Sequence, residues 1–489
     1  MKKKILSLLF IFAVSKVFSQ SDIIWEKKIE HQKSNYLYNA IPTPDYGILL
    51  LGSTLSSDIG INQKKNNGQS DFYLVKIDED GKIEWENSYG GNKNDKLLNA
   101  KPTRDGGFIL IGSSNSDLSG DKSSDNLGQN DIWVIKLDPK GKITWDETIG
   151  GIGDDIPVDI IQTNNNEYII AGISNSPSVI KSTRFQNSTS FLVKLDTNGQ
   201  KKWEKLLSDH TTKIIKNIFL DNNSFKVLGN DESGGKSSFF SNSYDHDGNI
   251  ISEILYDDNY LMNVIKSDNQ YYLTLKDIKG SETINKLIVL DENMSQVSST
   301  TLEIKNNLDL KEIFLNKDYI ISTSNQINTL DDKKTSKIPE SYYNYETFDL
   351  SGKKLNSKKL GLKGYNYLEK SIITRDNSII LFGSSSEIKN NLQDNSQLYL
   401  VKIGDKENQN NRKFIEAYPN PTSDFVNILI NKDFDNATIE IYNITGQYLQ
   451  SIVVKYRSTP ISLENYPSGL YIAKINYDNQ TESIKIIKK

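Results

Sequence analysis

Short apolar runs closed by Gly, Asn or Asp make up most of this chain, and no stretch of useful length has the period of an amphipathic helix. The plainest runs are FYLVKID, from Phe72, and IWVIKLD, from Ile132. A turn and a second run that carries a tryptophan follow each of them. Runs of this length that are rich in β-branched and aromatic residues predict β-strands. They are apolar on both faces apart from one lysine, as in a strand that lies between neighbouring sheets.

The runs recur at a nearly constant spacing. Trp25, Trp85, Trp145 and Trp203 are 60, 60 and 58 residues apart. A second phrase precedes each copy of the first, as in YGILLLGS, GFILIGSS and YIIAGIS. Weaker copies of both phrases continue as far as QLYLVKIGD, which makes seven copies of each. A period of this size indicates a repeat architecture.

Each copy divides into four strands, and seven such units without helices are typical of a β-propeller. The seventh copy ends at Ile403 without a fourth strand, because the residues that follow are all polar. The chain begins instead with an unmatched strand, Ile23 to Ile29. We therefore predict an all-β, seven-bladed propeller in which this N-terminal strand completes the last blade and covers its edge.

The last part of the chain, from Lys413, reads as a small β-sandwich of alternating runs. Three local features mark it, namely Pro419-Asn420-Pro421, a hairpin turn at Gly446, and Pro467-Ser468-Gly469-Leu470-Tyr471 before a final run that ends in lysines. In this combination and order they resemble the type A C-terminal sorting domain of the type IX secretion system of Bacteroidetes. The resemblance implies an export signal for the outer membrane, with the type IX secretion machinery as partner, and not a catalytic module.

The N-terminal end is typical of a secretory signal peptide. A lysine-rich start precedes an apolar run from Ile5 to Val14, and small side chains place the cleavage between Ser19 and Gln20. The run is too short for a stable anchor, and no later stretch approaches the ~20 apolar residues of a spanning helix, so we expect no transmembrane anchor. The protein is then expected to pass through the periplasm and to be secreted or held at the outer-membrane surface. We predict a signal peptide at 1–19, a propeller at 20–403, a linker at 404–412 and a sorting domain at 413–489.

Composition removes several classes of function. The chain has no cysteine, which excludes disulfides, a thiol nucleophile and cysteine-ligated zinc. Its net charge is −5 with both signs interspersed, so no basic face indicates nucleic acid. Three widely spaced histidines, His31, His210 and His246, do not support a histidine metal site or a Ser-His-Asp triad. Nothing marks two of the 63 acidic residues as a pair for glycoside hydrolysis.

The turn phrase Asp-x-x-Gly-Lys-Ile-x-Trp resembles the tryptophan-docking motif of quinoprotein-like propellers, and the whole repeat resembles those of large secreted propeller-like proteins of Bacteroidetes. We interpret its residues as structural. Asp78 and Gly81 suit a tight hairpin, and Trp85 is a large flat side chain that suits the interface between blades. The resemblance to quinone-binding enzymes implies calcium ligands and funnel carboxylates, and no such set is identified. We therefore expect no cofactor.

Connections between second and third strands are long, as from Thr54 to Ser70 and from Ser114 to Asn130. In an up-and-down blade they emerge on the same face as the connections between blades, so we expect one face to gather the insertions and to bind a partner. The second loop contains Asp117, Asp121 and Asp125, whose carboxylates suit Ca²⁺, although a flexible acidic loop without a metal is the preferred interpretation.

We expect from the sequence an exported, non-catalytic binding protein for glycan or protein. The alternative is a secreted hydrolase, similar to glycoside hydrolases, whose site in the propeller funnel has no sequence signature. Asp95 and Asp155 each follow a Gly-Gly pair by a few residues and are interpreted as structural.

Overall fold

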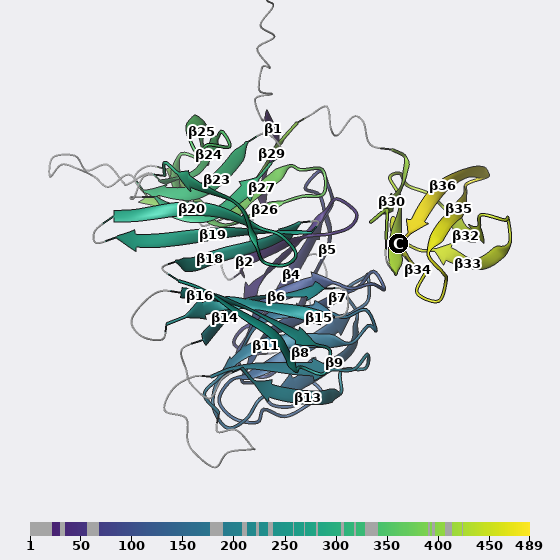
Figure 1. Ribbon diagram of the computed structural model, residues 1–489, viewed down its shortest axis with the longest axis horizontal. Helices are drawn as coiled ribbons and strands as arrows, with labels where there is room; N and C mark the ends of the chain where they lie inside the picture. Colours follow the sequence, from purple (N-terminus) through teal and green to yellow (C-terminus); the bar gives the residue numbers. More distant parts are fainter. Residues whose placement is uncertain are drawn as a thin grey trace, which may run out of the picture.

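The computed structural model describes residues 22–29, 35–55, 68–176, 189–207, 213–221, 224–232, 238–257, 259–267, 269–279, 282–304, 308–316, 319–327, 341–389, 392–393, 397–405, 413–422 and 424–489. The named elements in these ranges are all β-strands, and they form seven propeller blades and a C-terminal sandwich (Figure 1). Nothing in these ranges forms a helix with the length and apolarity needed to cross a membrane.

Blades 1 to 6 are four-stranded antiparallel sheets with their strands in chain order. Blade 1 contains β2 (Asn35–Pro42), β3 (Ile48–Thr54), β4 (Asp71–Ile77) and β5 (Ile83–Tyr89). Blade 2 contains β6 (Asp95–Pro102), β7 (Phe108–Ser114), β8 (Asp131–Leu137) and β9 (Ile143–Ile149). Blade 3 contains β10 (Asp155–Gln162), β11 (Tyr168–Ser174), β12 (Thr189–Leu195) and β13 (Lys201–Leu206).

The second half of the ring repeats this order. Blade 4 contains β14 (Lys213–Asp221), β15 (Ser224–Asp231), β16 (Ser238–Asp245) and β17 (Ile250–Tyr256). Blade 5 contains β18 (Tyr260–Ser267), β19 (Gln270–Lys279), β20 (Glu282–Leu290) and β21 (Gln296–Leu302). Blade 6 contains β22 (Asp309–Leu315), β23 (Ile320–Ile327), β24 (Ser341–Phe348) and β25 (Lys354–Leu360).

Blade 7 is completed by the N-terminal strand, as the sequence predicts. It contains β26 (Gly364–Ile373), β27 (Ile379–Lys389), β29 (Gln397–Gly404) and, outermost, β1 (Asp22–Ile29), while the short β28 (Leu392–Gln393) pairs with β27. β1 runs antiparallel to β29 and places Trp25 opposite Lys402. The predicted all-β class with seven blades and a closing N-terminal strand is confirmed.

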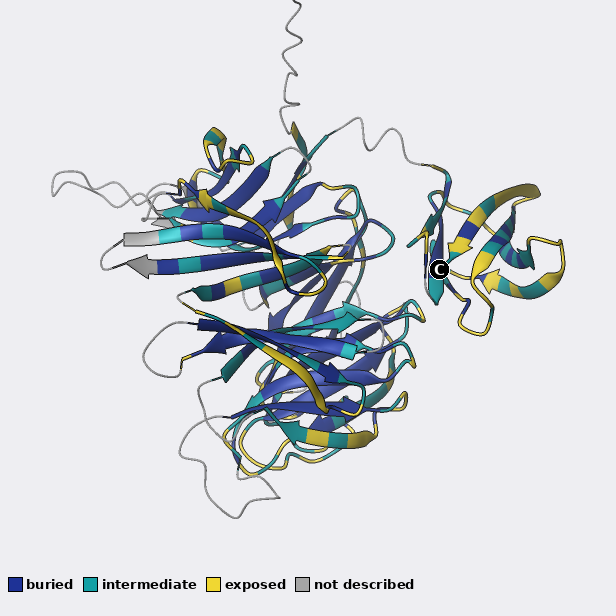
Figure 2. Cartoon of the chain, in the orientation of Figure 1, coloured by how far each residue is buried: buried dark blue, intermediate teal, exposed yellow. Residues whose placement is uncertain are grey.

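Burial follows the position of a strand within its blade (Figure 2). Every residue of the third strands β4 and β8 is buried, whereas most residues of the outermost strands β17 and β21 are exposed. The inner strands are apolar on both faces because each sheet packs against its two neighbours in the ring.

The lysine that interrupts the third strands is buried and paired. Lys136 lies 2.7 Å from Asp105, and Lys402 lies 3.0 Å from Asp376. Both carboxylates belong to the turn between the first and second strands of the same blade, and blade 1 has the same pairing. A charge that is removed from water needs such a partner, so the lysine belongs to the scaffold.

Each first strand carries a polar residue directly after a register shift of the kind made by a β-bulge. Two of the contacts between blades are a hydrogen bond from Asn99 Nδ2 to Asp159 Oδ1 at 3.0 Å and an ion pair between Lys370 and Glu312 at 2.5 Å. These contacts tie neighbouring blades together near the axis. The seven residues are Asn39, Asn99, Asp159, Asn217, Asn263, Glu312 and Lys370.

The fourth-strand tryptophans dock on the next blade. A Cβ added at Gly199, in the Asp-x-x-Gly turn of blade 3, would lie 2.7 Å from the indole of Trp145, and one at Gly248 of blade 4 would lie 2.9 Å from Trp203. Both glycines have positive φ, which favours glycine in any case. Trp25 of the closing strand donates from Nε1 to Glu79 O of blade 1 at 2.9 Å. The motif is therefore a joint between consecutive blades.

The C-terminal sandwich packs the three-stranded sheet β30-β31-β34 on the four-stranded sheet β33-β32-β35-β36. Side chains from both sheets, such as Val426, Ile439 and Ile475, form a core separate from that of the blades. The domain boundaries stay predictions, because residues 1–21 and 406–412 lie outside the described ranges. The strands are β30 (Ile415–Tyr418), β31 (Phe425–Ile430), β32 (Ala437–Asn443), β33 (Tyr448–Val454), β34 (Ser458–Ser462), β35 (Gly469–Tyr477) and β36 (Gln480–Lys488).

Candidate functional site

The propeller has two unlike faces. The short-turn face carries the turns between first and second strands and between third and fourth strands, and the long-loop face carries the other connections. On the long-loop face, Asp95 N donates to Ser70 O at 2.7 Å and Asn115 N donates to Asn94 O at 3.1 Å. The described ends of the loops 54–70 and 114–130 therefore meet at one connection between blades. Residues 56–67 lie outside the described ranges.

The loop 114–130 is held by polar contacts. Ser116 Oγ donates to Asp95 Oδ2 at 3.0 Å, and Lys122 Nζ donates to Ser116 O at 2.8 Å. Lys122 is buried, and this burial lowers the pKa of its ammonium group although the charges of Asp131 and Asp95 oppose the change. Despite its small apolar content, the loop has a defined conformation.

The three carboxylates considered for calcium have separate partners. Asp117 pairs with Lys93 at 2.9 Å, and this hydrogen bond and charge lower the pKa of Asp117. Asp121 Oδ2 accepts a hydrogen bond from Gly90 N at 3.3 Å, and Asp125 Oδ1 accepts one from a backbone amide of its own loop at 3.1 Å. Within the described ranges, no three His, Asp or Glu side chains are grouped as a metal ion requires. The calcium site stays a prediction, and these contacts add no support for it.

Each Gly-Gly pair donates a backbone hydrogen bond to a buried aspartate beneath this face, and the arrangement repeats in blades 2 and 3. Asp95 and Asp155 begin the first strands of blades 2 and 3 and are fully or almost fully buried. Asp95 Oδ2 accepts from Gly91 N at 2.7 Å, and Asp155 Oδ2 accepts from Gly151 N at 2.8 Å and from Ser176 Oγ at 2.7 Å. Burial raises the pKa of both carboxyl groups. A Cβ at Gly151 would come within 3.0 Å of Ser176, so glycine leaves room for the contact.

Large apolar side chains are exposed on the long-loop face. Leu118 and Leu127, in the loop 114–130, are 61% and 53% exposed, and Ile152, in the connection to blade 3, is 68% exposed. Tyr36 and Leu55 are exposed at the same end of the strands of blade 1. These side chains make the long-loop face a candidate interaction surface.

The Pro419-Asn420-Pro421 segment is tied to the last strand of the sandwich. Asn420 Nδ2 donates to Lys485 O at 2.7 Å, and Asn420 Oδ1 accepts from Ile487 N at 2.9 Å. The peptide bonds before both prolines are cis. This part of the predicted motif therefore joins the first and last strands of the sandwich.

The other motif residues lie at turns and strand starts. Gly446 has a φ of +82° in the turn between β32 and β33, where Asn443 Oδ1 caps the backbone. Gly469 begins β35, and Tyr471 is buried with its hydroxyl donating to Pro467 O. These residues shape the sandwich, and they do not gather at one place with the Pro419-Asn420-Pro421 segment.

Arg375, in the turn between β26 and β27 of blade 7, joins the propeller to the sandwich. Its Nη2 donates to Glu416 Oε2 at 2.7 Å, and Tyr46 Oη donates to the same oxygen at 2.6 Å. The guanidinium carbon lies 4.6 Å from the ring centre of Tyr46 and 4.1 Å from that of Tyr418. The side chains of Arg375 and Glu416 are each only 13% exposed, so the carboxylate is held in a largely enclosed place.

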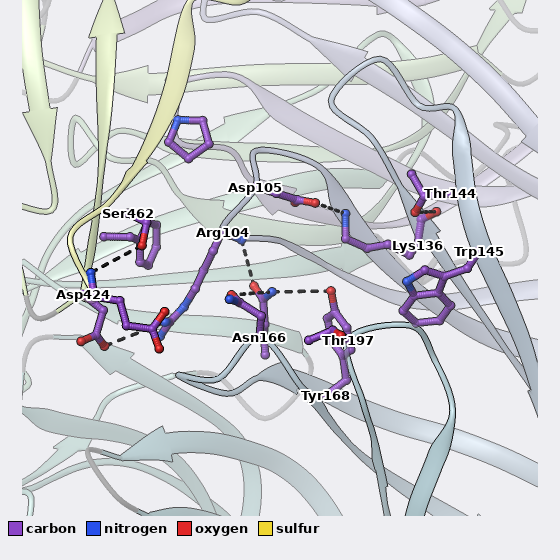
Figure 3. Close-up of a pocket in the computed structure, with 14 residues that line it drawn as sticks. Arg104, Asp105, Lys136, Thr144, Trp145, Asn166, Tyr168, Thr197, Asp424 and Ser462 are labelled. Atoms are coloured by element: carbon purple, nitrogen blue, oxygen red, sulfur yellow. Dashed lines mark hydrogen bonds and ion pairs between the residues drawn. The ribbon is translucent and has the colours of Figure 1, made fainter. Parts of the chain in front are cut away.

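Arg104, in the corresponding turn of blade 2, lies near a second carboxylate and ring of the sorting domain, at a longer distance (Figure 3). Its Nη1 lies 3.9 Å from Asp424 Oδ2, and its guanidinium carbon lies 5.1 Å from the ring centre of Phe425. Nη1 also donates to Asn164 O of blade 3 at 2.9 Å, which sets the direction of the side chain. Burial lowers the pKa of Arg104, and the charge of Asp424 opposes this.

A cleft of about 680 Å³ opens beside Arg104, between blades 2 and 3 and the sandwich (Figure 3). The propeller side of the cleft includes the rings of Trp145 and Tyr168 and the ion pair between Lys136 and Asp105. Such a lining offers hydrogen-bonding groups and ring faces to a bound molecule. The cleft and the arginine contacts together give the short-turn face a polar surface with buried cations and ring faces.

Comparison with known protein families identifies the sandwich. Residues 416–489 match the family described as the secretion system C-terminal sorting domain. The chain ends in a type IX sorting domain. This domain indicates export to the medium or the cell surface and implies interaction with the secretion machinery.

Several solved structures are similar to the chain at low sequence identity, with TM-scores below 0.5. An acylaminoacyl peptidase of Pyrococcus horikoshii is 11% identical with a TM-score of 0.42, and the match covers 81% of this chain and 58% of that one, less than two thirds of the peptidase. The β-propeller domain of the Trilobed protease from Pyrococcus furiosus is 10% identical with a TM-score of 0.42, covering 76% and 94%. Drosophila Semaphorin 2a is 9% identical with a TM-score of 0.43, covering 95% and 97%. No curated protein sequence matches the chain.

The sequence reasoning missed the contacts of the sorting domain with Arg104, Arg375 and Tyr46. These residues lie in the first turn of each blade, which reads TPDYG, TRDGG, TNNNE and TRDNS in blades 1, 2, 3 and 7. Arginine occupies the second position in two copies, and tyrosine stands where the other copies have Gly or Asn. Tyr46 has a φ of +66°, a region that disfavours a bulky residue. These departures from the common turn sequence are the signal by which the sequence could have indicated the three residues.

The predicted cleavage site and two of the three histidines cannot be located in the described part of the chain. Ser19, Gln20, His31 and His210 lie outside the described ranges. His246 lies in a turn of blade 4, where its backbone oxygen accepts a hydrogen bond from Trp203 Nε1 at 3.3 Å.

Proposed function

We propose that the protein is a non-catalytic binding protein whose long-loop face engages an extracellular protein. The observation that carries the proposal is the exposure of Leu118, Leu127 and Ile152. The backbone amides of Leu118, Leu127 and Gly153 each donate to a side-chain oxygen, so these connections are held in place. A loop that is ordered before binding loses little conformational entropy when it binds, and apolar groups within a polar surface are typical of interaction sites. Their aliphatic character favours a protein over the glycan that the sequence left open.

The geometry of the full chain supports the same face. The sorting domain covers part of the short-turn face of blades 1, 2 and 7 through Glu416, Asp424 and Arg457. The long-loop face lies on the other side of the ring, away from these described contacts of the sorting domain. The finer steps of the export route belong to the proposal, namely cleavage after Ser19, passage through the periplasm of a Bacteroidetes cell, and release or retention at the outer-membrane surface.

Affinity capture with the full chain as bait tests the proposal. Proteins captured from the medium and from the outer-membrane fraction of the source cells are quantified by mass spectrometry. Leu118→Ser with Leu127→Ser should reduce recovery of a specific protein by about tenfold or more. Ile251→Ser with Leu255→Ser, on the exposed strand β17 of blade 4, is the matched control and should leave recovery unchanged.

Equal capture by both variants would move the binding site away from the long-loop face. Binding to a glycan array without any specific protein partner would restore the glycan interpretation. Turnover of polysaccharides or peptides by the full chain would replace a binding protein with the hydrolase alternative.

A further inference from the structure

The two arginine contacts with the sorting domain have the same composition. Arg375 contacts the carboxylate of Glu416 and the ring of Tyr418. Arg104 lies near the carboxylate of Asp424 and the ring of Phe425. We propose that the short-turn face is a recognition surface for a polypeptide segment with acidic and aromatic side chains. The sorting domain occupies this surface in the full chain, and a partner protein can take its place when the sorting domain is absent or displaced.

The propeller orients each arginine without help from the sorting domain. Arg375 Nη1 donates to Pro44 O at 3.2 Å, and the Tyr46 ring lies against its guanidinium. Arg104 is held in a similar way by Asn164 O. Because these groups belong to turns of blades 1 and 3, the cations are already directed when a carboxylate arrives. Arginine that is oriented in advance suits both carboxylates and ring faces.

Tyr46 shows that the Arg375 site is more than a chance contact. The corresponding turn positions in other blades are Gly106, Asn166 and Asn377, residue types that accept a positive φ more readily than tyrosine. Tyr46 adopts the same strained conformation, and its hydroxyl and ring both contact the carboxylate site. A strained residue whose side chain completes a binding site indicates function.

The sorting domain competes for this surface from within the same chain, which favours it over a separate ligand. The short connection 404–412 keeps the sorting domain near the propeller, which corresponds to an effective concentration on the order of mM. A partner segment therefore binds weakly while the sorting domain is docked and more tightly once it is displaced. This surface is distinct from the long-loop face, so either binding site can exist without the other.

A full-length variant with reversed charges on the sorting domain tests the proposal. Glu416→Lys, Asp424→Lys and Arg457→Glu together should displace the domain, which X-ray scattering would record as a larger radius of gyration. The probe is a fluorescent synthetic peptide with the sequence of residues 413–427, followed by anisotropy. It should bind the displaced variant about tenfold or more tightly than the wild type. Adding Arg375→Ala and Arg104→Ala should remove this gain.

The controls separate recognition from general attraction. A peptide with Gln and Asn in place of the two acids should bind about tenfold more weakly, and one with Ala in place of Tyr418 and Phe425 should also lose affinity. Unchanged scattering after charge reversal would show that these contacts do not hold the sorting domain. Failure of the displaced variant to bind the peptide, or binding that ignores the arginine substitutions, would overturn the proposed surface. A thermal melt of each variant verifies that the propeller remains folded.

Discussion

At the scale of single residues, the buried lysines explain how a charged side chain recurs in strands that are otherwise apolar. Lys402 has no exposed side-chain surface, and its partner Asp376 is 4% exposed. Thr374 Oγ1 donates to the same aspartate at 2.5 Å. Each pair links the third strand of a blade to the turn after its first strand. Removal of one partner would leave the other charge buried and unpaired, which is far more costly than loss of a surface pair.

Lys402→Met should therefore lower the free energy of unfolding by about 3–5 kcal/mol. Lys201→Met is the matched control, because Lys201 and its partner Glu204 are each about half exposed, and we expect a loss of less than about 1 kcal/mol. Urea unfolding monitored by circular dichroism measures both values. Similar losses for the two variants would mean that burial of the pair does not matter.

At the scale of elements, the joint between blades consists of one tryptophan and one glycine. The indole of Trp145 packs over the turn of the next blade. Gly199 in that turn has a φ of +87° and no room for a side chain. The blades have separate hydrogen-bonded sheets, so joints of this kind and the side chains packed around them transmit stability from one blade to the next.

Gly199→Ala and Trp145→Ala should each destabilise the protein, the second by about 2–3 kcal/mol because the indole is only partly buried. The double variant should lose less than the sum, since the added methyl group no longer meets the indole. Gly446→Ala is the control for backbone strain alone, because it has a similar φ of +82° but nothing within 4 Å of the added Cβ. Additive losses in a double-mutant cycle would contradict the joint.

At the scale of the whole molecule, ring closure depends on the N-terminal strand. Without β1, the strand β29 of blade 7 would expose an unpaired edge, and Trp25 would no longer reach blade 1. Deletion of residues 20–30 should lower the melting temperature and cause aggregation, measured by calorimetry and light scattering. Deletion of residues 1–19 alone is the control and should change neither. A deletion of 20–30 that melts like the control would disprove the closure.

Export belongs to the same scale. Deletion of residues 413–489 should leave a folded propeller in the periplasm, because among the described strands none of the sorting domain pairs with a strand of a blade. Cell fractionation with an antibody to the propeller measures its location, and protease resistance of the periplasmic pool verifies folding. Normal secretion of the truncated protein would refute the role of the sorting domain in this chain.

The local pattern of the sequence was sufficient for the architecture. Strand alternation, turn residues and the spacing of Trp25, Trp85, Trp145 and Trp203 depend on near neighbours in the chain, and a repeat presents the same signal several times. The missing fourth strand after Ile403 and the extra strand at the start predicted the closure. Three short motifs, at Asn420, Gly446 and Gly469, together and in this order indicated the sorting domain, because each motif is local and their order can be read along the chain.

Tertiary structure alone decided which distant groups meet. Arg375 and Tyr46 come from opposite ends of the propeller sequence, and only ring closure brings blades 7 and 1 together around Glu416. The docking of the sorting domain on the short-turn face depends on the shape of two folded surfaces, which no local period encodes. The exposure of Leu118 likewise follows from the contacts that hold its loop, because an apolar residue in a sequence reads the same whether it is buried or left in water.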